Sequence, residues 1–160
     1  MGTKVLTMLE PLWQGFPPVD PWAVSGSASC TLAPRYESVS GARKFTRETL
    51  QGWDLDDLFD GVGLVVSELV TNALRHAVLA APTLADTPPP ARLHLMRWSS
   101  RLVCAVRDPS DDSPVAGEAD SGAESGRGLH LVDSFSDSWG WHPLSGTPHG
   151  KIVWALFRLP

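Results

Sequence analysis

Hydrophobic residues recur at three- and four-residue intervals between positions 55 and 77, which is the strongest periodic pattern in the chain. The repeating positions are Leu55, Leu58, Phe59, Val62, Val65, Val66, Leu69, Val70, Ala73, Leu74 and Ala77. Such spacing places apolar side chains on one face and predicts a long amphipathic helix. We expect Asp54 to cap its first turn and Pro82 to end it.

A second, shorter helix is predicted from about 41 to 52, because Ala42, Phe45, Thr49 and Leu50 share one helical face. Ser38 or Ser40 is the expected cap of this helix, and Gly52 is expected to close it. A third helix is predicted over 129–135, directly after a segment rich in Gly, Ser and acidic residues.

Alternating or continuous apolar runs predict strands at 25–33, 91–98, 101–107, 137–142 and 150–159. In this order of elements, helices on one face of a mixed, mostly antiparallel sheet would bury every apolar pattern. We therefore predict an α+β two-layer sandwich. Residues 1–24 are expected to form a flexible N-terminal tail, and residues 25–160 a single domain.

The composition excludes several classes of protein. The 160 residues are 42% hydrophobic and carry a net charge of −5, which is typical of a globular chain but argues against non-specific binding of nucleic acid. No apolar run is long enough to span a membrane. Cys30 and Cys104 have no metal-ligand spacing, so we expect buried free thiols in a cytoplasmic protein.

Two polar residues interrupt the apolar stretch of the long helix. Glu68 and Asn72 are four residues apart, so their side chains leave the helix on the same side. A solvent-facing pair is the ordinary interpretation of such spacing. Alternatively, the Asn72 amide gives an oxygen ligand to Mg²⁺, and Glu68 polarises a nearby water or hydroxyl group. His76 adds a third polar side chain four residues further on.

Two further motifs suit a nucleotide, although each also has an ordinary structural interpretation. Asp108 follows an apolar strand, where its carboxylate could accept a hydrogen bond from an exocyclic amine such as adenine N6, or simply form a turn. Gly126, Arg127 and Gly128 precede a helix, where backbone amides can approach a phosphate, or where a flexible loop simply ends. The acidic loop before them could close over a ligand.

Taken in order, these motifs resemble a known family. Glu68-Leu-Val-Thr-Asn72-Ala, Asp108 after a hairpin, Gly126-Arg-Gly128-Leu and the final strand Gly150-Lys-Ile-Val-Trp-Ala-Leu are similar to the histidine-kinase-like ATPase fold, also called the Bergerat fold. The likeness covers about residues 25–159. It is greatest to the bacterial anti-sigma-factor serine/threonine kinases.

This resemblance implies a role for each matching residue. It implies that Asn72 binds Mg²⁺ and that Glu68 is the general base acting on a serine of a partner. It also implies that Asp108 binds the adenine amine. Gly126, Arg127 and Gly128 would lie in or beside a lid over the phosphates, and His76 would line the pocket.

Two positions beside the expected nucleotide depart from the family's pattern. Ser110 stands where the family has the glycine of its Asp-x-Gly motif. Lys151 stands where a threonine near the adenine is usual. Both departures bear on the affinity for a nucleotide rather than on the fold.

Two functions follow as alternatives from the resemblance. The first is an ATP- and Mg²⁺-dependent serine/threonine kinase that phosphorylates an anti-anti-sigma partner and so controls transcription. The second is a binding module of the same fold that holds a sigma factor or its antagonist without catalysis. A homodimer is also implied. A metabolic hydrolase is disfavoured, because no Ser-His-Asp or Cys-His set forms a recognisable motif.

Overall fold

The computed structural model describes residues 24–79, 91–108, 123–143 and 150–160. Within these ranges, five strands and three α-helices follow one another, with one short 3-10 helix before the second α-helix. They are β1 (Val24–Leu32), α2 (Glu37–Gly52), η2 (Asp56–Leu58), α3 (Phe59–Leu79), β2 (Ala91–Trp98), β3 (Arg101–Asp108), α4 (Ala123–Phe135), β4 (Ser138–Pro143) and β5 (Lys151–Arg158).

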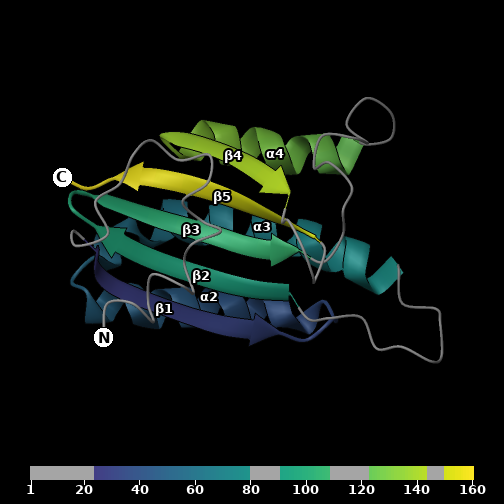
Figure 1. Cartoon of the computed structure of the whole chain (residues 1–160), viewed down its shortest axis with the longest axis horizontal. Helices are drawn as coiled ribbons and strands as arrows, with labels where there is room; N and C mark the ends of the chain where they lie inside the picture. Colours follow the sequence, from purple (N-terminus) through teal and green to yellow (C-terminus); the bar gives the residue numbers. More distant parts are fainter. Residues whose placement is uncertain (1–23, 80–90, 109–122, 144–149) are drawn as a thin grey trace.

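The five strands form one sheet in the order β1-β2-β3-β5-β4 (Figure 1). Every pairing between neighbouring strands is antiparallel. β5 lies between β3 and β4, so the last strand of the chain enters the interior of the sheet, while β1 and β4 are its edges.

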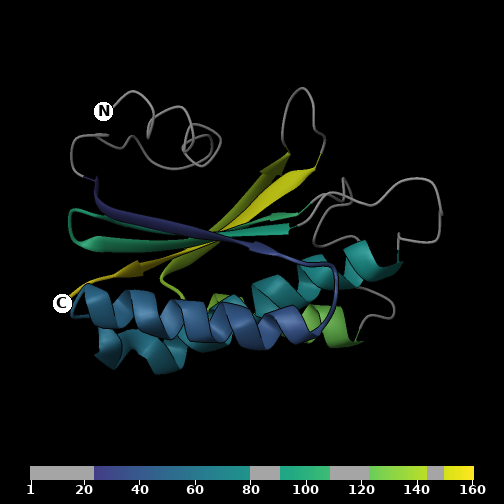
Figure 2. The ribbon, with the colours of Figure 1, turned by 90° about the horizontal axis from the view of Figure 1, so that it is seen from below.

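The three α-helices lie on one face of this sheet, as the view along its edge shows (Figure 2). α3 is the middle helix and contacts both α2 and α4, as well as β3 beneath it. The predicted α+β two-layer fold is therefore confirmed, with one helical layer and one antiparallel sheet.

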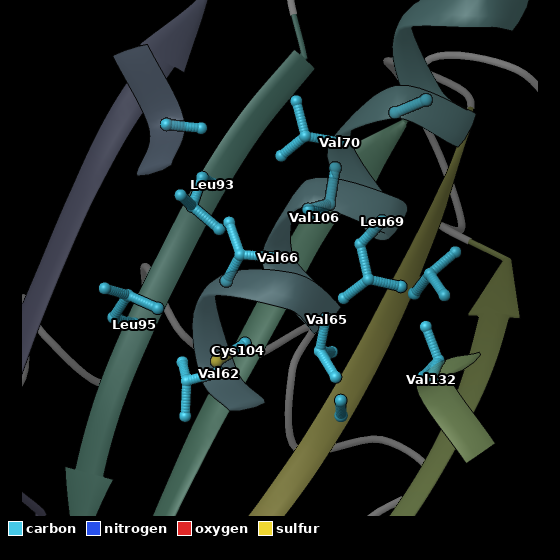
Figure 3. Close-up of a cluster of buried hydrophobic side chains, with 14 of the residues drawn as sticks. Val62, Val65, Val66, Leu69, Val70, Leu93, Leu95, Cys104, Val106 and Val132 are labelled. Atoms are coloured by element: carbon cyan, nitrogen blue, oxygen red, sulfur yellow. The ribbon is translucent and has the colours of Figure 1, made fainter. Parts of the chain in front are cut away.

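The main core fills the space between the two layers (Figure 3). Val62, Val65, Val66, Leu69 and Val70 of α3 point down onto the sheet and are almost completely buried. The strands meet them with the residues of one face, which include Leu93, Leu95, Cys104, Val106, Val153, Ala155 and Phe157. The apolar face that two-residue alternation gives the sheet thus packs against the apolar face that the three- and four-residue period gives α3.

Both cysteines are free thiols, as predicted. Cys104 is completely buried, and burial strongly raises the pKa of its thiol. Cys30 is only half-buried, and desolvation raises its pKa despite the opposing charge of Arg92. Neither thiol is therefore prepared to act as a thiolate nucleophile.

The connection between α2 and α3 differs from the prediction. α2 ends at Gly52, but the residue with the left-handed backbone is Asp54, with φ of 59°. Asp54 does not cap α3, because the short helix η2 comes first and α3 begins only at Phe59. Neither expected serine caps α2: Tyr36 is its N-cap, and the Ser38 hydroxyl donates to the Ala33 carbonyl at 2.9 Å.

Within the described ranges, no helix is long and apolar enough to cross a membrane. The expected tail and most of the acidic loop lie outside the described residues.

Candidate functional site

Glu68 and Asn72 lie on the flank of α3 that faces α4. Val65 and Leu69 mark this flank, since they lie beside Val132 of α4 (Figure 3). Glu68 and Asn72 follow Val65 by three and seven residues, which returns them to the same side of a helix with 3.6 residues per turn. The opposite flank faces α2, where Arg43 donates to the Ser67 hydroxyl at 3.1 Å.

Both side chains are half-buried, so they stand at the margin of the core and not in open solvent. The hydrogen bonds and ion pairs of the described ranges include none from either side chain. A carboxylate and an amide at the edge of a helix interface have lost part of their hydration without gaining a protein partner. Two partly desolvated polar groups of this kind are available to bind a ligand.

Asp108 forms an ion pair with Lys151 that the sequence did not predict. The two residues face each other across the antiparallel pair β3 and β5, and Lys151 Nζ lies 3.1 Å from Asp108 Oδ2. Both side chains are buried, with exposed fractions of 0% and 2%. Charged side chains at this depth need a partner, so the contact holds the two residues together.

The ion pair points towards the helical layer. Leu102, Cys104 and Val106 of β3 belong to the main core, and side chains alternate along a strand, so Asp108 shares their face. On β5, Lys151 shares the face of Val153 in the same way. Gly150 precedes it with φ of 135°, a conformation that favours glycine and brings the chain into β5.

The three residues Gly126, Arg127 and Gly128 lie inside α4 and not in front of it. The sequence predicted a helix from 129, but α4 begins at Ala123. Glycine is a poor helix former, which is why a segment with two glycines looked like a loop. The free backbone amides at the start of this helix therefore belong to residues 123–126. The side chains of α4 before Leu129 lie outside the described residues.

Four elements meet at one end of the molecule (Figure 1). The arrowhead of β3, the start of β5, the last turns of α3 and the first turns of α4 all lie there. α3 also contacts β3 and α4 directly. The carboxylate of Asp108, the ammonium group of Lys151 and the positive end of the α4 dipole thus lie at this end of the fold. Glu68 and Asn72 lie further back along α3, as the tenth and fourteenth of its 21 residues.

Two further predicted site residues do not have a described environment. Ser110 lies outside the described residues, as does the side chain of His76, although its backbone is part of α3. In the described ranges, no group of three or more His, Cys, Asp or Glu side chains is placed to hold a metal ion.

Comparisons with known proteins support the same architecture. The model of the histidine kinase-like ATPase domain matches residues 32–157. A chain from the crystal structure of the SiaB–SiaC complex of Pseudomonas aeruginosa has a similar fold, with a TM-score of 0.57 and 11% sequence identity, over 97% of this chain and 98% of that one. Among proteins with curated descriptions, none matches this sequence.

Proposed function

The chain belongs to the family of histidine kinase-like ATPase domains, and on this basis we propose that it binds ATP with Mg²⁺ and phosphorylates a serine or threonine of a partner protein. The observation that carries this proposal is the meeting of four elements at one end of the fold. Asp108 and Lys151 lie at this end, and helical periodicity puts Glu68 and Asn72 on the flank of α3 that faces α4.

Asp108 and Lys151 are suited to hold the adenine ring. One edge of adenine offers an amino donor at N6 beside an acceptor at N1. A carboxylate that accepts and an ammonium group that donates, 3.1 Å apart, are complementary to this edge. Asp108 would accept from N6 while Lys151 donates to N1. Lysine can also donate to guanine O6, so GTP is the nucleotide to compare with ATP.

The phosphates would lie towards the start of α4. Backbone amides of residues 123–126 have no partner within their own helix, and the helix dipole favours an anion at this end. Asn72 would supply one oxygen to Mg²⁺, which prefers oxygen ligands and commonly shares its remaining positions between water and phosphate. Bound Mg²⁺ would neutralise charge on the phosphates.

Glu68 would orient the acceptor hydroxyl. It lies one helical turn before Asn72 on the same flank, so a hydroxyl bound there is near the nucleotide's phosphate end. The carboxylate would take the hydroxyl proton as oxygen attacks the γ-phosphorus. The bond to the β-phosphate oxygen then breaks, leaving ADP and a phosphorylated side chain.

Phosphoryl transfer tests this role directly. The protein is incubated with γ-labelled ATP, Mg²⁺ and a candidate anti-anti-sigma protein, and Glu68→Gln is compared with wild type. We expect Glu68→Gln to bind ATP normally and to transfer label on the order of a hundredfold more slowly, because only the proton acceptor is lost. Glu48→Gln, which changes an exposed carboxylate on α2, is the matched control. Equal transfer by Glu68→Gln and wild type would remove Glu68 from the mechanism.

The proposed partner is an anti-anti-sigma protein or a sigma factor, which makes the chain a regulator of transcription. The sequence motifs resemble anti-sigma-factor kinases, and the similar solved structure is that of a two-protein complex. Phosphorylation would add about −1.5 to −2 charge to the partner and weaken an apolar interface. By the same resemblance we propose a homodimer that acts in the cytoplasm.

A binding module without catalysis is the second candidate. The Asp108–Lys151 pair favours it, because the carboxylate that would bind adenine already has a buried partner. Such a module would hold its protein partner through the same fold, with or without nucleotide. If calorimetry detects no heat at millimolar ATP with Mg²⁺ while the partner still binds, this second function is the correct one.

A further inference from the structure

Two arginines face each other on the side of the sheet opposite the three described helices, which we call the second face. Arg92 of β2 and Arg107 of β3 are directly opposed in the antiparallel register. Both lie on the second face, because their neighbours Leu93 and Val106 belong to the main core and side chains alternate along a strand. Opposed residues have Cβ atoms about 5 Å apart, so the two guanidinium groups start from adjacent positions.

No carboxylate of the five described strands neutralises these two charges. Asp108 is the one acidic residue in those strands, and it lies on the helical face, where it pairs with Lys151. The positions that flank the two arginines on the second face hold Thr31 of β1 and Ile152 of β5. The chain has 18 acidic residues against 13 basic ones, so this local positive charge does not follow from the composition.

The two guanidinium groups also make few hydrogen bonds within the described ranges. Arg92 Nη2 donates to the Ser29 hydroxyl at 3.5 Å, which is a long contact, and Arg92 Nε has no partner there. In the same ranges Arg107 has neither a hydrogen bond nor an ion pair. Each arginine offers five N–H donors, so most donors of the two side chains are available. Like charges directly opposite each other on neighbouring strands are destabilising, and an anion between them would offset this cost.

His94 lies beside the two arginines on the same face, two residues after Arg92 and diagonal to Arg107. Desolvation first, and then the charges of Arg92 and Arg107, lower the pKa of His94 to about 4. The imidazole is therefore neutral at pH 7 and adds no third charge, while its N–H group remains a hydrogen-bond donor. Since both charges act on this one ring, the two guanidinium groups lie in the same part of the face.

From the strand register, the uncompensated charges and the available donors, we propose that Arg92 and Arg107 bind a phosphate group on the second face of the sheet. A phosphate monoester carries about −1.5 to −2 charge at pH 7, which matches two guanidinium groups, whereas one carboxylate would neutralise only one of them. The planar guanidinium group also binds phosphate through two parallel N–H···O bonds. The site is separate from the proposed nucleotide site, which lies on the helical side of the sheet.

Binding of inorganic phosphate to the full chain tests this proposal. Calorimetry without Mg²⁺ or nucleotide gives the dissociation constants of wild type, Arg107→Gln and Arg101→Gln. We expect Arg107→Gln to weaken binding about tenfold or more, because charge-assisted hydrogen bonds are lost. Arg101→Gln is the matched control, since it removes the same charge from the same face at the other end of β3, and it should bind like wild type. Equal affinity of Arg107→Gln and wild type would place the phosphate elsewhere and overturn the proposal.

Free phosphate and a phosphorylated side chain offer the same chemistry, and a second titration distinguishes these two sources. A short phosphoserine peptide is compared with inorganic phosphate and with the unphosphorylated peptide. Tighter binding of the phosphopeptide than of phosphate identifies a phosphorylated side chain as the source, and weaker or equal binding identifies the free ion. In both cases Arg107→Gln must weaken the binding. A peptide that binds equally well with and without its phosphate would contradict the proposal.

Chemical modification of the unaltered chain provides a test that does not depend on the folding of a variant. Phenylglyoxal reacts with guanidinium groups, and mass spectrometry gives the rate at each arginine. With phosphate tenfold above its dissociation constant, modification of Arg92 and Arg107 should slow about tenfold, because only about one site in eleven is then free. The rates at Arg101 and Arg158 should not change. If phosphate leaves the rates at Arg92 and Arg107 unchanged as well, the two arginines do not bind it.

Discussion

Among single residues, the buried pair of Asp108 and Lys151 has the largest consequences. Two ions have been removed from water, and each is stable there only because of the other and of further contacts in the same place. The pair therefore links the stability of the sheet to the site. The contact that holds the two buried side chains together also sets their position relative to a ligand.

Breaking this pair from one side is expected to cost more than removing both charges. Lys151→Met leaves the Asp108 carboxylate buried without its counterion and should lower the free energy of unfolding by about 3–5 kcal/mol. The double variant Lys151→Met with Asp108→Leu should recover a large part of that loss. Urea denaturation measures both values. A single variant as stable as wild type, or a double variant worse than the single, would contradict a paired state.

His94 makes stability depend on pH. Its pKa is lowered to about 4 in the folded chain, first by desolvation and then by Arg92 and Arg107, from 6.5 when unfolded. The unfolded chain therefore binds the extra proton between these values, so stability is complete above pH 6.5 and falls as the pH drops towards 4. The expected loss is up to about 3 kcal/mol. His94→Gln should remove this part of the pH dependence, whereas the exposed His130→Gln should not.

At the scale of secondary-structure elements, the sequence is informative where the determinants are local. The three- and four-residue period of α3 and the apolar runs of β2, β3 and β5 predict those elements to within a few residues, because each pattern is fixed by one interface. The start of α4 was missed, since its glycines have low helix propensity and the helix depends on packing against α3. The Asp108–Lys151 pair depends on strand register between distant segments, which no local pattern contains.

Two glycines in α3 offer a matched test of how tightly this helix is packed. A methyl group at Gly61 would meet nothing within 4 Å, so Gly61→Ala should stabilise the protein by about 1 kcal/mol through helix propensity. At Gly63 the methyl carbon would lie 2.9 Å from the Phe59 ring, which also stacks with Arg47 at 4.5 Å. Gly63→Ala should therefore show no such gain. Equal melting temperatures for both variants would show that Phe59 moves away freely.

At the scale of the whole molecule, binding residues and packing surfaces are separated. The described groups suited to a nucleotide lie at one end of the two layers, around the start of α4 and the end of β3. The face of the sheet opposite the three described helices carries other buried apolar side chains, among them Met96 and Trp154.

We propose that the chain binds ATP with Mg²⁺ through Asn72 and Asp108, and isothermal titration calorimetry measures this binding. Saturable binding of ATP with Mg²⁺ is expected, weakened about tenfold or more, or at least 1.4 kcal/mol, by Asn72→Ala or by chelating the metal. Glu48→Gln should bind like wild type. If the folded wild-type protein shows no saturable binding at millimolar ATP with Mg²⁺, the claim is wrong.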